Sequence, residues 1–216
     1  MSTGRSSPIP DFAQEFRHQL RELFVWRRDV RHFRPIPISP DVLARLLELA
    51  HLAPSVGLSQ PWRFVLVDDP HRRTAIVQNF EVCNAQALMD EPAERAQIYA
   101  RLKLAGLQEA PIHLAVFAED ATRQGHGLGR RTMPETVQYS AVMAIHTLWL
   151  AARAEGIGVG WVSILDPAAV AMILEVPSHW AFIGYLCLGY PAYSDDTPEL
   201  ERQGWQARTQ MQILRR

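Results

Sequence analysis

The sequence WRRDVRHFR occupies residues 26–34 and places four arginines in eight positions of a chain whose formal net charge is -1. Arginine gathers where a phosphate must be held, because its planar guanidinium forms paired, charge-assisted hydrogen bonds. A solvated basic turn or a nucleic-acid patch would give the same local pattern. Asp29, which these arginines enclose, is either a salt-bridging residue that orients them or a base that its cationic surroundings keep ionised. The segment is therefore the first candidate for a functional site.

A second candidate is the stretch APSVGLSQPW at residues 53–62. Small residues with free backbone amides allow a flat ring or a phosphate to approach the chain closely. The same stretch could also be a plain connection from a helix to a strand. On its own it does not decide between these two interpretations.

The composition of the chain limits the classes of function. Its 216 residues are 48% hydrophobic and 21% charged, which predicts one globular domain over residues 1–216. The near-neutral charge gives no global case for a nucleic-acid or anionic-membrane partner. Two distant cysteines and the absence of a signal-peptide pattern in the first residues lead us to expect a reduced, cytoplasmic protein.

The region around the second stretch has clear helix and strand signals. Apolar residues at helical spacing predict a helix over 40–52, with Ser39 as its N-cap and Pro54 ending the run. Alternating residues predict a strand over 62–67, after which Asp69 is expected to cap a short helix. A further helical pattern covers 91–108.

The second half of the chain alternates in the same way. We expect strands over 112–118, 157–165 and 181–188, a glycine-rich loop over 124–131, and a short helix opening at Asp166. Thr132 and Glu135 suggest a capping box before a long helix that Gly156 ends. Because that helix is apolar nearly all round, it belongs in the centre of a domain or in a dimer interface.

Few strands and bulky helices together favour an α+β fold in which helices cover a modest mixed sheet. A dinucleotide-binding Rossmann fold is disfavoured, because the glycines at 156, 158 and 160 follow a helix and precede a strand, the reverse of the required order. The polar tail over 191–216 retains Trp205, Met211, Ile213 and Leu214, so we expect it to dock as an arm on a partner subunit.

Taken together, the two stretches resemble the FMN-binding pattern of the nitroreductase superfamily, in which an arginine-rich segment and a helix precede an APS-to-QPW segment. The sequences GLGRRTMPE at 127–135, LWLAARAEG at 148–156 and GVGWVS at 158–163 resemble, more narrowly, its 5,6-dimethylbenzimidazole synthase branch. The resemblance covers roughly residues 15–208. Asp29 is the telling departure from ordinary nitroreductases, which usually carry a small or hydroxyl residue there.

The resemblance implies a nitroreductase-like fold, with a mixed, mainly antiparallel sheet flanked by helices in an intertwined homodimer. It also implies that the protein consumes reduced FMN and O2, forming dimethylbenzimidazole for cobalamin synthesis and erythrose 4-phosphate, with a separate NAD(P)H-dependent reductase supplying the reduced FMN. Asp29 and Ser163 would be the catalytic residues. The implied FMN-binding residues are Arg27, Arg28, Asp29, Val30, Arg31, Ser55, Leu104 and Ser163.

Some expectations concern what surrounds such a site. A lid that excludes water is expected from residues 81–108 or 122–131. His32 and His146 are expected to be structural, since neither has a second ligand at metal-like spacing, and no metal is expected. An NAD(P)H-dependent nitroreductase or flavin reductase, and a non-catalytic flavin-binding protein, remain as rival functions. Asp29 argues against the reductase.

Overall fold

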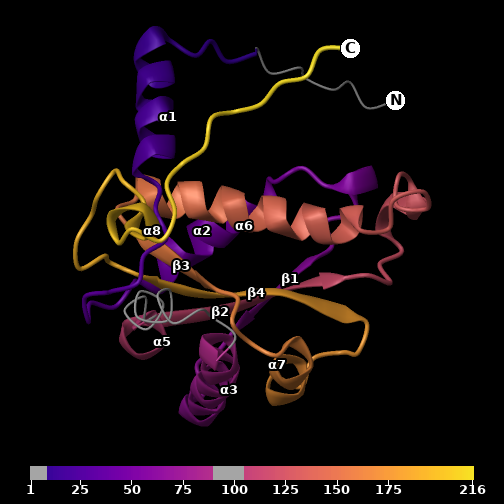
Figure 1. Ribbon diagram of the computed structural model, residues 1–216. Coiled ribbons are helices and arrows are strands. Elements are labelled where there is room, and N and C mark those ends of the chain that lie inside the picture. Colours follow the sequence, from indigo (N-terminus) through magenta and orange to yellow (C-terminus); the bar gives the residue numbers. More distant parts are fainter. Residues whose placement is uncertain (1–8, 90–104) are drawn as a thin grey trace.

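The computed structural model describes residues 9–89 and 105–216 (Figure 1). Its helices are α1 (Gln14–Trp26), α2 (Pro40–His51), α3 (Pro70–Met89), α5 (Gly106–Glu109), α6 (Thr136–Ala154), α7 (Pro167–Ile173) and α8 (Glu199–Arg202). Its strands are β1 (Trp62–Leu66), β2 (Ile112–Glu119), β3 (Gly158–Val162) and β4 (Trp180–Gly189), and short 3-10 turns lie at η1 (Val56–Leu58) and η2 (Gln124–Gly127).

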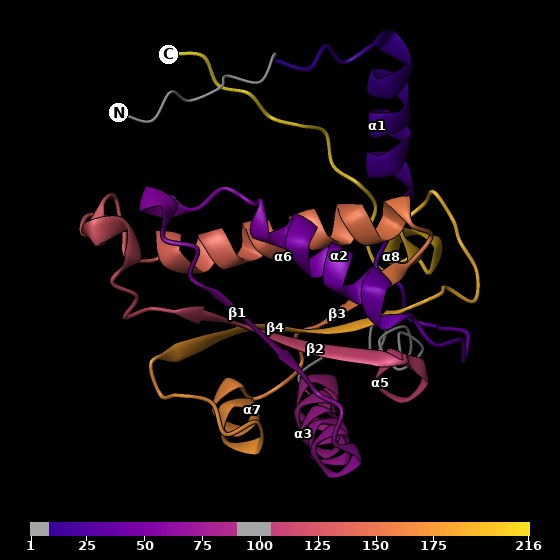
Figure 2. The ribbon, with the colours of Figure 1, turned by 180° about the vertical axis from the view of Figure 1, so that it is seen from behind.

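The four strands form one sheet in the order β1-β2-β4-β3, and all three pairings are antiparallel. Helices α2 and α6 cover one face, whereas α3 and α7 cover the other (Figures 1 and 2). A parallel pairing occurs at an isolated bridge between Asp29 and Val159. The predicted α+β architecture with a mainly antiparallel sheet is confirmed.

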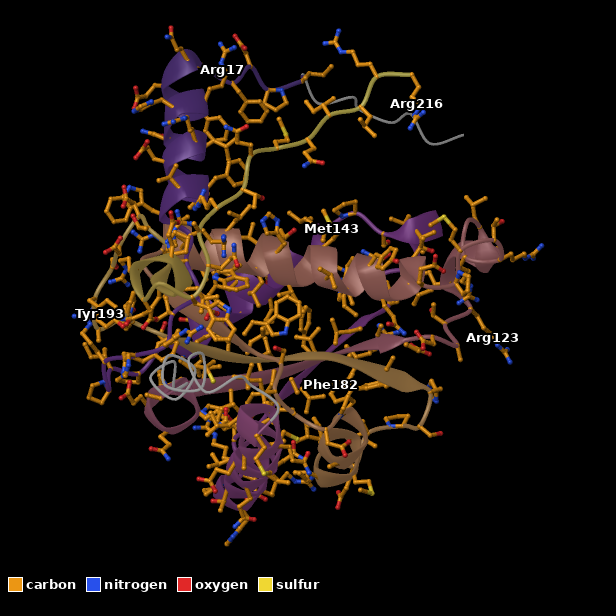
Figure 3. The ribbon with its side chains drawn as sticks, viewed as in Figure 1. Arg17, Arg123, Met143, Phe182, Tyr193 and Arg216 are labelled. Atoms are coloured by element: carbon orange, nitrogen blue, oxygen red, sulfur yellow. The ribbon has the colours of Figure 1, made fainter. Side chains whose placement is uncertain are left out.

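The long helix α6 packs one face on the sheet. Its fully buried Ile145 and Leu148 meet Leu114 and Val116 of β2, which point to the same side because strand side chains alternate. Each such buried aliphatic side chain contributes about 2 kcal/mol through removal from water. The opposite face of α6 is apolar yet exposed, and Figure 3 shows Met143 on the side of the helix away from the sheet.

The layer on the α3 and α7 side contains a buried polar pair. His113 is only 2% exposed, and its Nδ1 lies 3.0 Å from the hydroxyl oxygen of Tyr185. Burial, reinforced by the charge of Arg73, lowers the pKa of His113 to about 4. The imidazole is therefore neutral in the folded protein at neutral pH.

This burial predicts a loss of stability in acid. Unfolded chains protonate histidine below about pH 6.5, whereas folded His113 takes up its proton only near pH 4. The free energy of unfolding should thus fall by about 3 kcal/mol as the pH drops through this window, from this residue alone. Denaturant unfolding of the wild type and of His113→Gln at both ends of the window would measure it. An equal acid loss in both proteins would contradict the assignment.

Most predicted elements are confirmed with small shifts at their ends. The hydroxyl of Ser39 accepts a hydrogen bond from the Val42 amide at 3.3 Å, and the Asp166 carboxylate accepts one from the Ala168 amide at 2.8 Å. Both residues therefore cap helices as expected. Asp69 likewise accepts from the His71 amide at 2.8 Å.

Two expectations are wrong. The helix after Asp69 is not short but runs for 20 residues as α3, and because Ile76 alone is buried along it, it has little apolar periodicity to reveal its length. The capping box is absent: α6 begins at Thr136 after Glu135, without a side-chain cap. The Thr132 and Met133 amides instead bond to the Gly129 carbonyl in a preceding turn.

One expected helix and one expected lid segment include residues that the structure does not describe. The expected helix over 91–108 and the first of the two expected lid segments, 81–108, fall mostly outside the described residues. The second lid candidate contains η2 and the glycines around it. Among the helices that are described, none combines the length and apolar character needed to cross a membrane.

Candidate functional site

The arginine-rich segment follows α1 and runs beside β3. The Val30 amide donates to the Val159 carbonyl at 3.0 Å, next to the Asp29–Val159 bridge. This approach requires glycine on the strand, because a Cβ at Gly160 would lie 2.3 Å from the Val30 carbonyl oxygen and one at Gly158 would lie 2.6 Å from the Val30 side chain. The glycine pattern of β3 therefore serves to seat Asp29 against the sheet.

Two groups hold the Asp29 carboxylate. Its Oδ1 accepts a hydrogen bond from the Trp161 amide at 2.9 Å, and its Oδ2 lies 3.5 Å from Nε of Arg31. Burial raises the pKa of Asp29, the Trp161 hydrogen bond and Arg31 oppose that rise, and Glu199 adds to it. A carboxyl with a raised pKa and a fixed orientation is suited to accepting a proton during a reaction.

A pocket of about 170 Å³ is lined by four arginines and two carboxylates: Arg27, Arg28, Arg31, Arg208, Asp29 and Glu199. Arg27 and Arg28 come from the N-terminal segment, and Arg208 comes from the C-terminal tail. Burial lowers the pKa of both Arg27 and Arg28, and the charge of Arg208 lowers both further. Such a cluster of cations is stabilised by an anion placed among them.

Each arginine of the segment also has contacts within the chain. The guanidinium carbon of Arg27 lies over the Trp149 ring, 4.9 Å from its centroid. Nε of Arg28 donates a hydrogen bond to the Asp196 carbonyl at 2.8 Å. Arg31 lies between two carboxylates, 3.5 Å from Asp29 and 3.5 Å from Glu199. The start of the tail, where Figure 3 labels Tyr193, is thereby held against the arginine-rich segment.

The APSVGLSQPW stretch at residues 53–62 lies away from the arginine-rich segment. The Ser55 hydroxyl accepts from the Gln60 amide at 3.1 Å, and the Val56 amide donates to Ser140 in the first half of α6 at 3.0 Å. Trp149, which contacts Arg27, is nine residues further along that helix, or roughly 13 Å at 1.5 Å per residue. A single chain therefore keeps Ser55 apart from the arginine pocket.

The remaining predicted residues have different places. Ser163 is exposed and lies two residues after Trp161, directly beyond the end of β3. Leu104 lies outside the described residues. His32 has its Nδ1 3.4 Å from the Glu109 carboxylate, and His146 is exposed on α6. Within residues 9–89 and 105–216, no cluster of three potential ligands could hold a metal ion.

The model of the Nitroreductase family matches residues 24–190 of this chain. The matched range includes the arginine-rich segment, the APS-to-QPW stretch and all four strands. The chain belongs to the nitroreductase family.

Two bacterial relatives of this nitroreductase-family chain share one name. The chain is 61% identical to the 5,6-dimethylbenzimidazole synthase of Rhodospirillum rubrum, over 98% of this chain and 100% of that protein. It is 51% identical to the protein of the same name from Rhodobacter capsulatus, over 91% of this chain and 95% of that one. The resemblance to the 5,6-dimethylbenzimidazole synthase branch is confirmed.

A solved structure supports the nitroreductase fold independently. An iodotyrosine deiodinase bound to FMN and 3-iodo-L-tyrosine matches with a TM-score of 0.71, covering 91% of this chain and 97% of that one. The two sequences are 23% identical, so this likeness bears on the fold alone.

In this nitroreductase-family chain, Glu199 and Arg208 belong to the site although no local sequence motif marks them. Both belong to the tail, where the polar composition gave no sign of a return to residues 27–31. Their charges are the one available signal. Glu199 could have been expected to pair with an arginine of residues 27–34, and Arg208 to join those arginines around an anion. Trp149 was noted as part of a motif, but its position over Arg27 was not.

Proposed function

We propose that this protein is a 5,6-dimethylbenzimidazole synthase that fragments reduced FMN in the presence of O2. The products would be dimethylbenzimidazole, the lower ligand of cobalamin, and erythrose 4-phosphate. The observation that carries the proposal is the Asp29 carboxyl, oriented by Trp161 and Arg31 beside a pocket of arginines. The 61% identity to a named synthase over nearly the whole chain supports the same reaction.

The described residues fit FMN as the bound group. The arginine pocket crowds cations whose pKa values are already lowered, which suits the phosphate of FMN. Arg27, Arg28 and Arg208 would bind that phosphate. Arg31 would hold the orientation of the Asp29 carboxylate through their ion pair. Val30, whose amide donates to the Val159 carbonyl, would keep the segment against β3 next to the ligand.

Reduced flavin supplies the electrons that O2 receives and also the carbon atoms of the product. Fragmentation requires the first carbon of the ribityl chain to lose a proton. Asp29 would accept it, because its pKa is raised by burial while two hydrogen-bonding groups hold its orientation. Ser163, beyond the end of β3, would position the isoalloxazine ring with its hydroxyl.

Two copies of the chain would complete the site. Ser55 lies far from the arginine pocket within one chain, and the outward face of α6 exposes Tyr139, Val142 and Met143. The tail also exposes Met211, Ile213 and Leu214, and it extends beside α1 (Figure 2). A homodimer in which the exposed end of the tail arm docks on the second copy, while the start of the arm stays against the arginine-rich segment of its own chain, would cover both apolar regions.

Replacing Ser163 with alanine should lower the rate of dimethylbenzimidazole formation by about tenfold, as expected for one lost hydrogen bond to a charged or reacting group. The affinity for reduced FMN should change little, because the arginine pocket is untouched. Single-turnover product analysis would measure the rate. Ser178→Ala, at an exposed position before β4, is the matched control. A wild-type rate in Ser163→Ala would remove Ser163 from the mechanism.

The reaction itself is tested by supplying chemically reduced FMN and air to the purified protein and separating the products by chromatography. A synthase yields dimethylbenzimidazole and destroys the flavin. A flavin reductase or a flavin-binding protein returns intact FMN. In cells, a separate NAD(P)H-dependent reductase would supply the reduced FMN, and the cytoplasm is the compartment where we expect the reaction.

A further inference from the structure

Arg31 is shared by two carboxylates from distant parts of the chain. Its Nε lies 3.5 Å from Oδ2 of Asp29 and 3.5 Å from Oε2 of Glu199, the first residue of α8. The Arg31 side chain is only 11% exposed and the Glu199 side chain only 16%. Solvent therefore screens the charges of Arg31 and Glu199 less than it screens a surface pair, whereas the Asp29 side chain is 36% exposed.

The position of Glu199 is fixed by the segment that precedes it. The Asp196 carbonyl accepts hydrogen bonds from the Arg28 guanidinium, and the Thr197 amide donates to the Asp195 carboxylate at 2.7 Å. Asp195 also lies 3.4 Å from Nε of Arg202 at the end of α8. The first turn of α8 is thus held next to Arg31 by several contacts outside the shared pair.

Other charged or titratable groups face Asp29 as well. Arg27 lies on the same segment, and the Cys187 thiol approaches from β4, where burial raises its pKa and keeps it neutral. Tyr193 lies beside Glu199 and Arg202, and burial, followed by Glu199, raises its pKa. Neither the thiol nor the phenol carries charge at neutral pH, so Glu199 is the negative group that competes with Asp29 for Arg31.

We propose that Glu199 is a positioning residue which shares Arg31 with Asp29 and thereby keeps the Asp29 carboxyl able to take up a proton. With Arg31 to itself, Asp29 would hold its negative charge more firmly and would be a weaker base. The direction in which Glu199 moves the pKa of Asp29 agrees with this. The catalytic use of Asp29 rests on the proposed function, whereas the sharing of Arg31 does not.

The Trp161 amide offers a direct readout, because it donates to Asp29 Oδ1 and its NMR shift should follow the protonation of that carboxyl. The flavin-free protein would be labelled with ¹⁵N-tryptophan, which limits the spectrum to the chain's 6 tryptophans. Asp29→Asn identifies the Trp161 signal as the one whose titration disappears. Glu199→Gln should then move its titration midpoint to lower pH, and Arg31→Gln should move it to higher pH.

Two further variants separate this role from a structural one. Glu201→Gln makes the same charge change on α8 but removes a group 3.7 Å from Arg208, so it should leave the midpoint near the wild-type value. Glu199→Asp keeps the charge and should restore much of the wild-type midpoint. An unchanged or raised midpoint in Glu199→Gln would overturn the proposal, and so would an equal shift in Glu201→Gln. If the wild type forms no dimethylbenzimidazole, the proposed function fails, but this titration still decides the charge sharing.

Discussion

Replacement of Asp29 by asparagine is expected to lower the rate of dimethylbenzimidazole formation by about 10² to 10⁴-fold, the usual contribution of a general base. Asparagine has nearly the same shape, and its side-chain oxygen can still accept the Trp161 amide hydrogen bond. It cannot accept a proton. The loss should therefore fall on the chemical step, measured in a single turnover after reduced FMN is mixed with O2.

The affinity of Asp29→Asn for reduced FMN provides the internal check. This affinity should remain close to that of the wild type, because the phosphate is assigned to Arg27, Arg28 and Arg208, which the substitution leaves in place. Asp68→Asn is a suitable control, since Asp68 is an exposed acid 3.8 Å from Arg73 and far along the chain from the site. Product formation at the wild-type rate in Asp29→Asn would rule out Asp29 as the base.

Removal of Arg208 is expected to weaken the binding of reduced FMN by about 10 to 100-fold, as for a lost hydrogen bond to a charged group. Arg208 shares the pocket with Arg27 and Arg28 and depresses the pKa of both, so its charge is part of the same anion site. The double variant with Arg27→Ala should lose more affinity than either single variant. Anaerobic titration monitored by tryptophan fluorescence would give the dissociation constants.

Riboflavin distinguishes a phosphate contact from a general disturbance of the site. It has the same ring and ribityl chain but no phosphate, so Arg208→Ala should weaken its binding much less than that of FMN. Arg123→Ala is the control for loss of a surface arginine, because Arg123 lies at the other end of the molecule from Tyr193 (Figure 3). Equal losses for FMN and riboflavin in Arg208→Ala would show that the pocket does not hold the phosphate.

Local patterns predicted most of the secondary structure. Ser39 and Asp166 were recognisable as caps because a polar side chain preceded a proline and an apolar run, and the strands were recognisable by their alternation and breakers. The length of α3 was not predictable in this way, because a helix with a single buried residue has no apolar stripe. The expected capping box of α6 does not form, because Thr132 belongs to a turn before the helix, where its amide donates to the Gly129 carbonyl.

The candidate site was predictable only where its residues are close in sequence. The segment carrying Arg27, Arg28 and Asp29 showed itself through its composition. Glu199 and Arg208 reach the same place through the path of the tail, and no local periodicity encodes such a return. The separation of Ser55 from the arginine pocket was equally hidden, because the sequence does not show which end of α6 each motif contacts.

The most direct test of the central claim is to follow the fate of reduced FMN when it is mixed with the wild-type protein and O2. We expect flavin absorbance to be lost without recovery of FMN, with dimethylbenzimidazole and erythrose 4-phosphate formed in equal amounts. Quantitative return of oxidised FMN, with no dimethylbenzimidazole detected by chromatography, would contradict the account.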